Sequence, residues 1–164
     1  MNNRRDWAAL LLATALALFF AVAASAGDEA SPKVRGQTLY VPVYSHIYSG
    51  DRERPVYLAV TVSIRNTDPG HAIRLAVVDY FDTEGRRLQQ FIAEPVVLPP
   101  LASTRFVVKE SDKAGGSGAN CIVRWDAETP VNPPIVESVM ISTASQLGIS
   151  FTSRAQVIAE APPP

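Results

Sequence analysis

Residues 56–65 alternate between aliphatic side chains and small, polar or aromatic ones. The aliphatic set occupies every second position: Val56, Leu58, Val60, Val62 and Ile64. A period of two places such a set on one face of a β-strand. Burying one Val or Leu side chain contributes ~1.5–3 kcal/mol, so we expect this strand to lie at the centre of the hydrophobic core.

Shorter runs with the same period follow along the chain, separated by turn-forming residues such as those at 66–70 and 82–85. The pattern contains no convincing amphipathic helix. Seven or eight short strands with regular turns predict an immunoglobulin-like antiparallel β-sandwich over residues 37–158, with a small β-barrel as the alternative. We expect residues 27–36 to form a flexible leader and residues 159–164 a proline-rich, disordered tail.

Two of the shorter runs carry an acidic residue within the face that we expect to be buried. In the first run Asp79 interrupts a face made of Ile73, Leu75, Val77 and Phe81. In the second run Glu137 shares a face with Ile135, Val139 and Ile141. We expect both apolar faces to point into the core.

Residues 1–26 have the three parts of a secretory signal peptide. Arg4 and Arg5 precede an apolar run at 7–24, and small residues end the segment at Ala26. An uncleaved membrane anchor is the alternative, but alanine supplies much of the run and no stop-transfer flank follows. We therefore expect cleavage after Ala26, a periplasmic or secreted protein, and no stable membrane span afterwards.

Charge and cysteine content exclude several classes of protein. Removing residues 1–26 takes out two of the 15 basic and one of the 16 acidic residues, which leaves a net charge of −2. Nucleic acids and anionic lipids require a concentrated basic patch, so we expect neither as a partner. Cys121 is the only cysteine, so no internal disulfide can form. Its place on an apolar strand face with Val123 and Trp125 predicts a buried, unreactive thiol.

A small, polar and glycine-rich stretch at 112–120 leads directly into the strand at 121–125. We expect it to be a flexible loop mounted on a rigid sheet, which is how many recognition loops are built. A connecting loop without a binding function would have the same sequence pattern. Backbone N–H groups of such a loop could also form an anion-binding nest. The candidate binding residues of the loop are Asp112, Gly115, Gly116, Ser117, Gly118 and Asn120.

A second candidate binding surface lies in residues 39–48, where odd positions are mainly aliphatic and even positions mainly aromatic. The aromatic face comprises Tyr40, Tyr44, His46 and Tyr48. Aromatic rings with polar tips are favoured at recognition surfaces, although another segment of the chain could equally cover them. Pro42 cannot donate to a ladder, which predicts a sheet edge or a bulge.

Catalytic and metal-binding patterns are weak. No Gly-x-Ser-x-Gly elbow is present, so a hydrolase would have to use Ser117 or His46 with Asp51 or Glu53. Neither histidine has a partner at ligand spacing apart from Asp68, three residues before His71. We therefore assign no catalytic residue, no metal ligand and no cofactor.

Four ordered runs, which together span nearly the whole chain after residue 26, resemble the bacterial family catalogued as domain of unknown function 3124. The runs lie at 39–51, 63–68, 115–120 and 148–154. The resemblance implies an exported bacterial protein and carries over no catalytic or binding residues, since the family has no assigned function. The family often has an aromatic residue where Cys121 stands, which agrees with a buried position.

The sequence favours a non-enzymatic, exported binding or interaction module whose partner is a protein or a small ligand. A small periplasmic hydrolase and a metal- or anion-responsive accessory protein are the alternatives.

Overall fold

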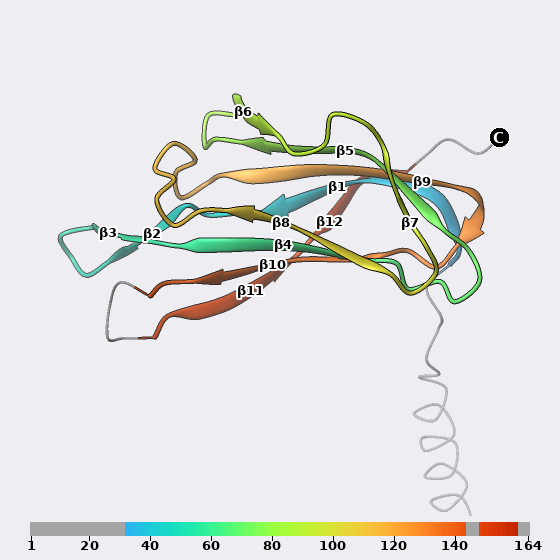
Figure 1. Cartoon of the computed structure of the whole chain (residues 1–164). Helices are drawn as coiled ribbons and strands as arrows, with labels where there is room; N and C mark the ends of the chain where they lie inside the picture. Colours follow the sequence, from blue (N-terminus) through green and yellow to red (C-terminus); the bar gives the residue numbers. More distant parts are fainter. Residues whose placement is uncertain (1–31, 144–147, 161–164) are drawn as a thin grey trace, which may run out of the picture. The chain divides into compact units, whose positions relative to one another are not determined.

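The computed structural model describes residues 32–143 and 148–160, and this part of the chain is all-β (Figure 1). Two antiparallel sheets pack face to face and do not close into a barrel, which confirms the predicted β-sandwich. The predicted signal peptide lies outside the described residues. Within those residues no helix is long and apolar enough to cross a membrane.

The first sheet has six strands in the order β12-β1-β9-β5-β6, with β7 also paired to β5. Its strands are β1 (Val34–Pro42), β5 (Ile73–Phe81), β6 (Arg87–Gln90), β7 (Val96–Leu98), β9 (Asn120–Val131) and β12 (Gln156–Glu160). The second sheet has the order β11-β10-β4-β8. Its strands are β4 (Ala59–Arg65), β8 (Ser103–Val108), β10 (Ile135–Ile141) and β11 (Ser150–Arg154). The described chain thus has twelve strands, including a separate hairpin of β2 (His46–Ser49) and β3 (Arg54–Tyr57), where the sequence predicted seven or eight.

The core lies between the two sheets and is centred on β4, as the alternation at 56–65 predicts. Leu58, Val60, Val62 and Ile64 are completely buried, whereas Val56 lies on β3 and is only half-buried. From the facing sheet, β9 contributes Cys121, Val123 and Trp125, which confirms the predicted inner face of that strand.

A β-bulge in β5 makes the predicted face of that strand wrong beyond Leu75. The register with β9 shifts between Leu75 and Val77. An extra residue reverses the direction of every later side chain. Val78 and Tyr80 are therefore buried, whereas Val77 and Phe81 are only half-buried.

The predicted face of β10 is also wrong. Val136, Ser138 and Met140 are buried between the sheets, whereas Ile135 and Ile141 are exposed. Ser138 is accommodated because its hydroxyl donates to the Pro42 carbonyl over 2.6 Å. The prediction failed because the inner positions of β10 include a serine and a methionine, whereas the outer positions include two isoleucines. The outer face therefore looked more apolar in the sequence.

Strand limits also differ from the predicted domain limits. Residues 34–36, expected in a flexible leader, begin β1, and residues 159–160, expected in the tail, end β12. Pro42 does not lie on an edge strand, because β1 is paired on both sides. It is the last residue of β1, and β12 pairs with β1 only as far as Tyr40, so no ladder donor is required there.

Candidate functional site

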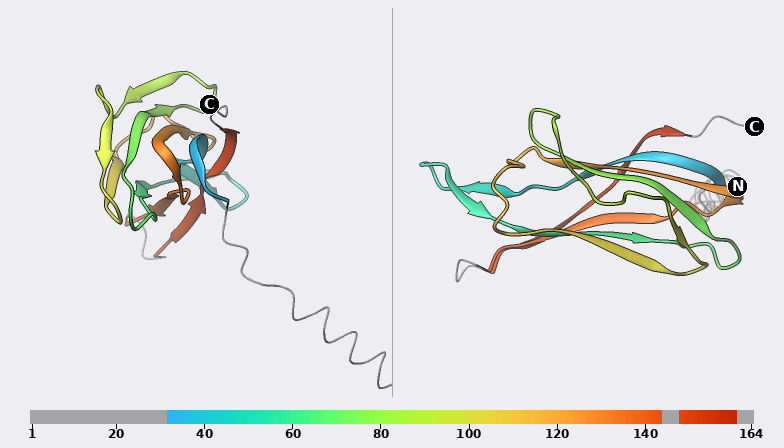
Figure 2. Two further views of the ribbon diagram at one scale, coloured as in Figure 1. Left: turned by 90° about the vertical axis from the view of Figure 1, so that its right-hand side faces the viewer. Right: turned by 45° about the horizontal axis from the view of Figure 1, so that its top comes forward.

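Hairpin β2–β3 belongs to neither sheet and extends beyond the ends of their strands (Figures 1 and 2). One face of this hairpin carries three aromatic rings. The His46 ring packs edge-on against Tyr48 and Tyr57, with centroid distances of 5.1 and 6.0 Å. Tyr48 is 55% exposed, so the outermost ring of the cluster is available to a partner.

The base of the hairpin is fixed to the glycine-rich loop through Ser45, which is completely buried. The Ser45 amide donates to the Gly116 carbonyl over 3.0 Å, and the Gly116 amide donates to the Ser45 hydroxyl oxygen over 2.8 Å. The Ser45 carbonyl in turn accepts from the Leu58 amide, where the chain leaves β3. Ser45 precedes β2, and its carbonyl binds the residue that follows β3. Its bonds to Gly116 therefore link both ends of the hairpin to the loop.

The same loop is fixed on its other side by Thr83, in the turn between β5 and β6. The Thr83 amide and hydroxyl both donate to the Gly115 carbonyl, over 2.9 and 3.1 Å. The Gly118 amide donates to the Thr83 hydroxyl oxygen over 3.1 Å. Ala119 is completely buried, and its carbonyl accepts from the Val43 amide. The loop thus ties the β2–β3 hairpin to the β5–β6 turn.

Two glycines in the loop are required by its geometry. A Cβ atom at Gly115 would overlap the Tyr80 hydroxyl and lie 2.9 Å from Tyr80 Cζ. Gly116 has a φ of +87°, in the left-handed region that other residues rarely adopt. The loop that we expected to be flexible therefore has four of its backbone groups hydrogen-bonded to Ser45 and Thr83. Whether the loop also contacts a partner stays a prediction.

The other predicted loop residues have different surroundings. Asp112 accepts a 2.8 Å hydrogen bond from the Ala114 amide and closes a turn at the start of the loop. Ser117 is exposed. Asn120 begins β9 between Pro42 and Phe81. Only Ser117 of these three lies fully at the surface.

The predicted aromatic face is divided among three places, because β1 ends at Pro42. Tyr40 lies in the first sheet between Ile122 and Gln156. The Tyr44 ring packs 6.4 Å from that of Phe151, against the core. Only His46 and Tyr48 share the hairpin face, where Tyr57 joins them.

The residues proposed for a hydrolase are not assembled into a catalytic arrangement. The His46 Nδ1 atom lies 3.5 Å from the Ser45 hydroxyl, which is already bonded to Gly116. Neither Asp51 nor Glu53 is hydrogen-bonded to His46. In the described part of the chain, no three His, Cys, Asp or Glu side chains are arranged to hold a metal ion.

Cys121 is completely buried and unpaired, which confirms the predicted environment of the thiol. Burial and the nearby Asp79 carboxylate raise the pKa of Cys121 to about 12. The thiolate is the reactive form of cysteine, so this side chain is unreactive at neutral pH.

Sequence reasoning missed the three residues that organise this end of the sandwich: Ser45, Thr83 and Tyr80. Each is separated from the loop by more than thirty positions in the sequence. Lys113 was missed as well; its ammonium lies 5.1 Å from the Tyr57 ring centroid and adds a contact between loop and hairpin. No local pattern marks such long-range contacts.

Comparisons with known proteins identify a family. A matching solved structure is the crystal structure of Thermotoga maritima 1070. Its sequence is 9% identical to this chain, the TM-score is 0.47, and the match covers 76% of this chain and 97% of that one. No curated protein matches the sequence. Residues 36–158 match the family described as "Protein of unknown function (DUF3124)", as the four sequence runs indicated. The chain belongs to this DUF3124 family.

Proposed function

We propose that the protein is an exported, non-enzymatic binding module that recognises a protein or small ligand through the β2–β3 hairpin. The observation that carries the proposal is the position of this hairpin, which lies outside both sheets and presents Tyr48 to solvent. An isolated two-stranded hairpin is marginally stable in water. Here the contacts of Ser45 with Gly116 hold it in one arrangement.

A rigid aromatic hairpin is well suited to recognition. Ordering flexible groups on binding costs free energy, and preorganisation removes part of that cost. Tyrosine adds a large contact area and a hydroxyl that can donate and accept. The glycine-rich loop therefore supports binding by holding the hairpin in place, whatever contacts its own exposed residues make.

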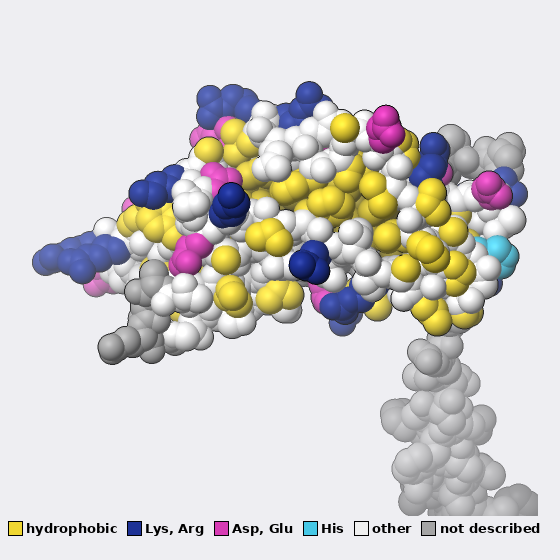
Figure 3. Space-filling model, viewed as in Figure 1, with side chains coloured by type: hydrophobic (Ala, Val, Ile, Leu, Met, Phe, Trp, Pro, Cys, Tyr) yellow, Lys and Arg dark blue, Asp and Glu magenta, His cyan; other side chains and the backbone are white. Residues whose placement is uncertain are grey.

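The charges at the tip of the hairpin favour a partner that is not strongly charged. Arg52 and Arg54 lie beside Asp51 and Glu53, so basic and acidic side chains balance. Figure 3 shows both basic and acidic side chains at this end of the sandwich. A balanced tip supplies specificity through hydrogen bonds and aromatic contact more than through long-range attraction.

Export is supported by the three-part segment at 1–26. We expect material recovered from the periplasm to begin at Gly27 when its N-terminus is sequenced. Periplasmic material beginning at Met1 would contradict cleavage after Ala26.

Replacing Tyr48 by alanine should strongly reduce partner capture without affecting the fold. Because Tyr48 is 55% exposed, its loss should change stability by no more than about 0.5 kcal/mol. Recovery of bound partner from periplasmic extract should fall at least about tenfold, which corresponds to ~1.4 kcal/mol of binding free energy. The measurement is quantitative capture by the purified domain, with the melting temperature recorded for each variant.

Leu88→Ala is the matched control, because Leu88 is 39% exposed and lies on β6. It should capture the same partner as the unmodified protein. Equal capture by Tyr48→Ala and Leu88→Ala would show that the hairpin is not the recognition element.

A further inference from the structure

A cleft of about 620 Å³ opens among residues 70–74, Val97 and residues 126–129. Its size is typical of sites for small ligands. The cleft involves the strand segments at the end of the sandwich opposite the β2–β3 hairpin, where Figure 3 shows a histidine beside acidic and basic side chains. None of its lining residues belongs to the proposed recognition element, so it is a separate site.

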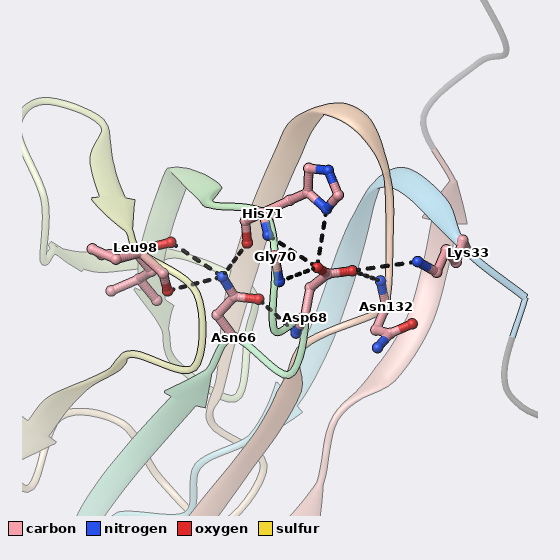
Figure 4. A network of polar contacts seen from close by, with 8 residues as sticks. Lys33, Asn66, Asp68, Gly70, His71, Leu98 and Asn132 are labelled. Atoms are coloured by element: carbon pink, nitrogen blue, oxygen red, sulfur yellow. Dashed lines mark hydrogen bonds and ion pairs between the residues drawn. The ribbon is translucent and has the colours of Figure 1, made fainter.

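One wall of the cleft is supported by Asp68, which is 1% exposed (Figure 4). Its carboxylate accepts from the backbone amides of Gly70, His71 and Asn132 over 2.9, 3.0 and 3.1 Å. The Lys33 ammonium lies 3.8 Å away. The bonds from the Gly70 and Asn132 amides hold the pKa of Asp68 well below its usual range, so the group is an anion at neutral pH.

The buried carboxylate sets the tautomer of His71. Nδ1 of His71 lies 3.1 Å from Oδ1 of Asp68. Since an ionised carboxylate can only accept, Nδ1 must carry a hydrogen and donate it. In the neutral ring Nε2 is then the acceptor, and Figure 4 shows this side of the ring turned away from Asp68. His71, which is half exposed and lines the cleft, thus offers a lone pair to a ligand.

The other charged side chains that line the cleft are one arginine and two carboxylates. Arg74 donates from Nε and Nη2 to the two carboxylate oxygens of Asp126, each over 2.8 Å. This bidentate pair neutralises both partners. Glu128 is exposed and forms no ion pair with any described residue. The cleft is therefore lined by one unneutralised carboxylate and one imidazole with a free lone pair, while Ala72, Val97 and Ala127 supply apolar contact.

We propose that this cleft binds a primary amine with a short apolar chain. The ammonium group donates to Nε2 of His71 and to the Glu128 carboxylate, and the chain packs on Val97. An ammonium has three donors and no acceptor, which matches a set of acceptors. A free amine and a lysine side chain of a peptide share this chemistry.

The test is a titration of the folded, ¹⁵N-labelled protein with n-pentylamine, followed by the amide shifts of the cleft residues. We expect saturable shifts at His71, Ala72, Ala127 and Thr129 with n-pentylamine and none with pentanoate, which has the same chain and the opposite charge. Nα-acetyl-lysine methylamide distinguishes the two sources: binding as tight as that of n-pentylamine indicates a lysine side chain, and weaker binding indicates a free amine.

Glu128→Gln should weaken n-pentylamine binding about tenfold, since it removes the charge and keeps the shape. Glu53→Gln, at the opposite end of the sandwich, is the matched control and should leave the affinity unchanged. Tyr48→Ala should also leave it unchanged, which separates this proposal from that for the hairpin. No saturable shift with n-pentylamine, tighter binding of pentanoate, or an unaltered affinity in Glu128→Gln would each overturn the proposal.

Discussion

Gly115→Ala should lower the free energy of unfolding by about 3 kcal/mol, the upper end of the usual cost of overpacking. The new Cβ would overlap the Tyr80 hydroxyl and lie 3.0 Å from the Ala119 Cβ. Tyr80 and Ala119 are both buried in the core, so neither can move aside. Chemical denaturation monitored by Trp125 fluorescence measures the change.

Tyr80→Phe tests the cause of this loss. The Tyr80 hydroxyl is buried without a hydrogen-bond partner among the described residues, so its removal should cost little on its own. In the Tyr80→Phe background, Gly115→Ala should be less damaging, because the overlapping atom is gone. The ring carbon at 2.9 Å remains, so the rescue should be partial.

Gly70→Ala is the control for a glycine that is not closely packed. Its added Cβ would meet only Asp68 Oδ1, at an ordinary 3.7 Å. Its stability should therefore change by no more than ~0.5–1 kcal/mol. If Gly115→Ala were as well tolerated as Gly70→Ala, the glycine-rich loop would not be packed as described.

Asp68→Asn should lower the melting temperature on the order of 10 °C at pH 7. The carboxylate accepts from three backbone amides and from the His71 ring. An asparagine amide has one acceptor oxygen, and its NH₂ group would face donors in place of the second oxygen. The lost hydrogen bonds should destabilise the loop at 66–72 and its contact with Asn132.

The effect of Asp68→Asn should depend on pH. The pKa of Asp68 is lower in the folded protein than in the unfolded chain, where it is about 3.9. Its contribution to stability is therefore complete above about pH 4 and is lost as the pH falls through the lowered value. Melting temperatures from pH 7 to pH 2 should show the two proteins converging below about pH 4.

Other acidic groups do not interfere with this comparison. Burial raises the pKa of Asp82, but hydrogen bonds from Arg86 outweigh that effect and lower it overall. Both proteins retain Asp82, so its contribution cancels in the difference. Asp51→Asn, at an exposed position, should follow the unmodified protein throughout. Parallel curves for the Asp68→Asn and unmodified proteins would contradict the role given to Asp68.

The strand pattern was predictable where side-chain type alone decides which face is buried. The run at 58–64 is such a case, because its four inward positions, Leu58 and the three inward positions of β4, are aliphatic and completely buried. The alternation of side chains predicts the wrong buried face where the register of a strand changes, or where a buried polar group is hydrogen-bonded to a residue far away in the sequence. The bulge after Leu75 reverses β5, and the bond from Ser138 to Pro42 permits a hydroxyl inside the core.

The candidate site was predictable only in part. Tyr48 and the glycine-rich loop were identified from local composition, and they lie at the same end of the sandwich. Their relationship was not predictable, because it depends on Ser45 and Thr83, which lie 71 and 32 positions away in the sequence from the loop residues that they bind. A glycine needed for close packing and a glycine needed for flexibility look the same in the sequence.

Hydrogen exchange of single backbone amides tests most directly whether the loop holds the hairpin. The Ser45, Thr83 and Gly116 amides each donate a hydrogen bond within the loop and its anchors. They should exchange at least about a thousandfold more slowly than an unstructured peptide, close to the rates of β9 amides. The amide of exposed Ser117 serves as the internal reference for rapid exchange. Exchange of Thr83 and Gly116 as fast as Ser117 would show that the loop is free and that the hairpin is not held by it.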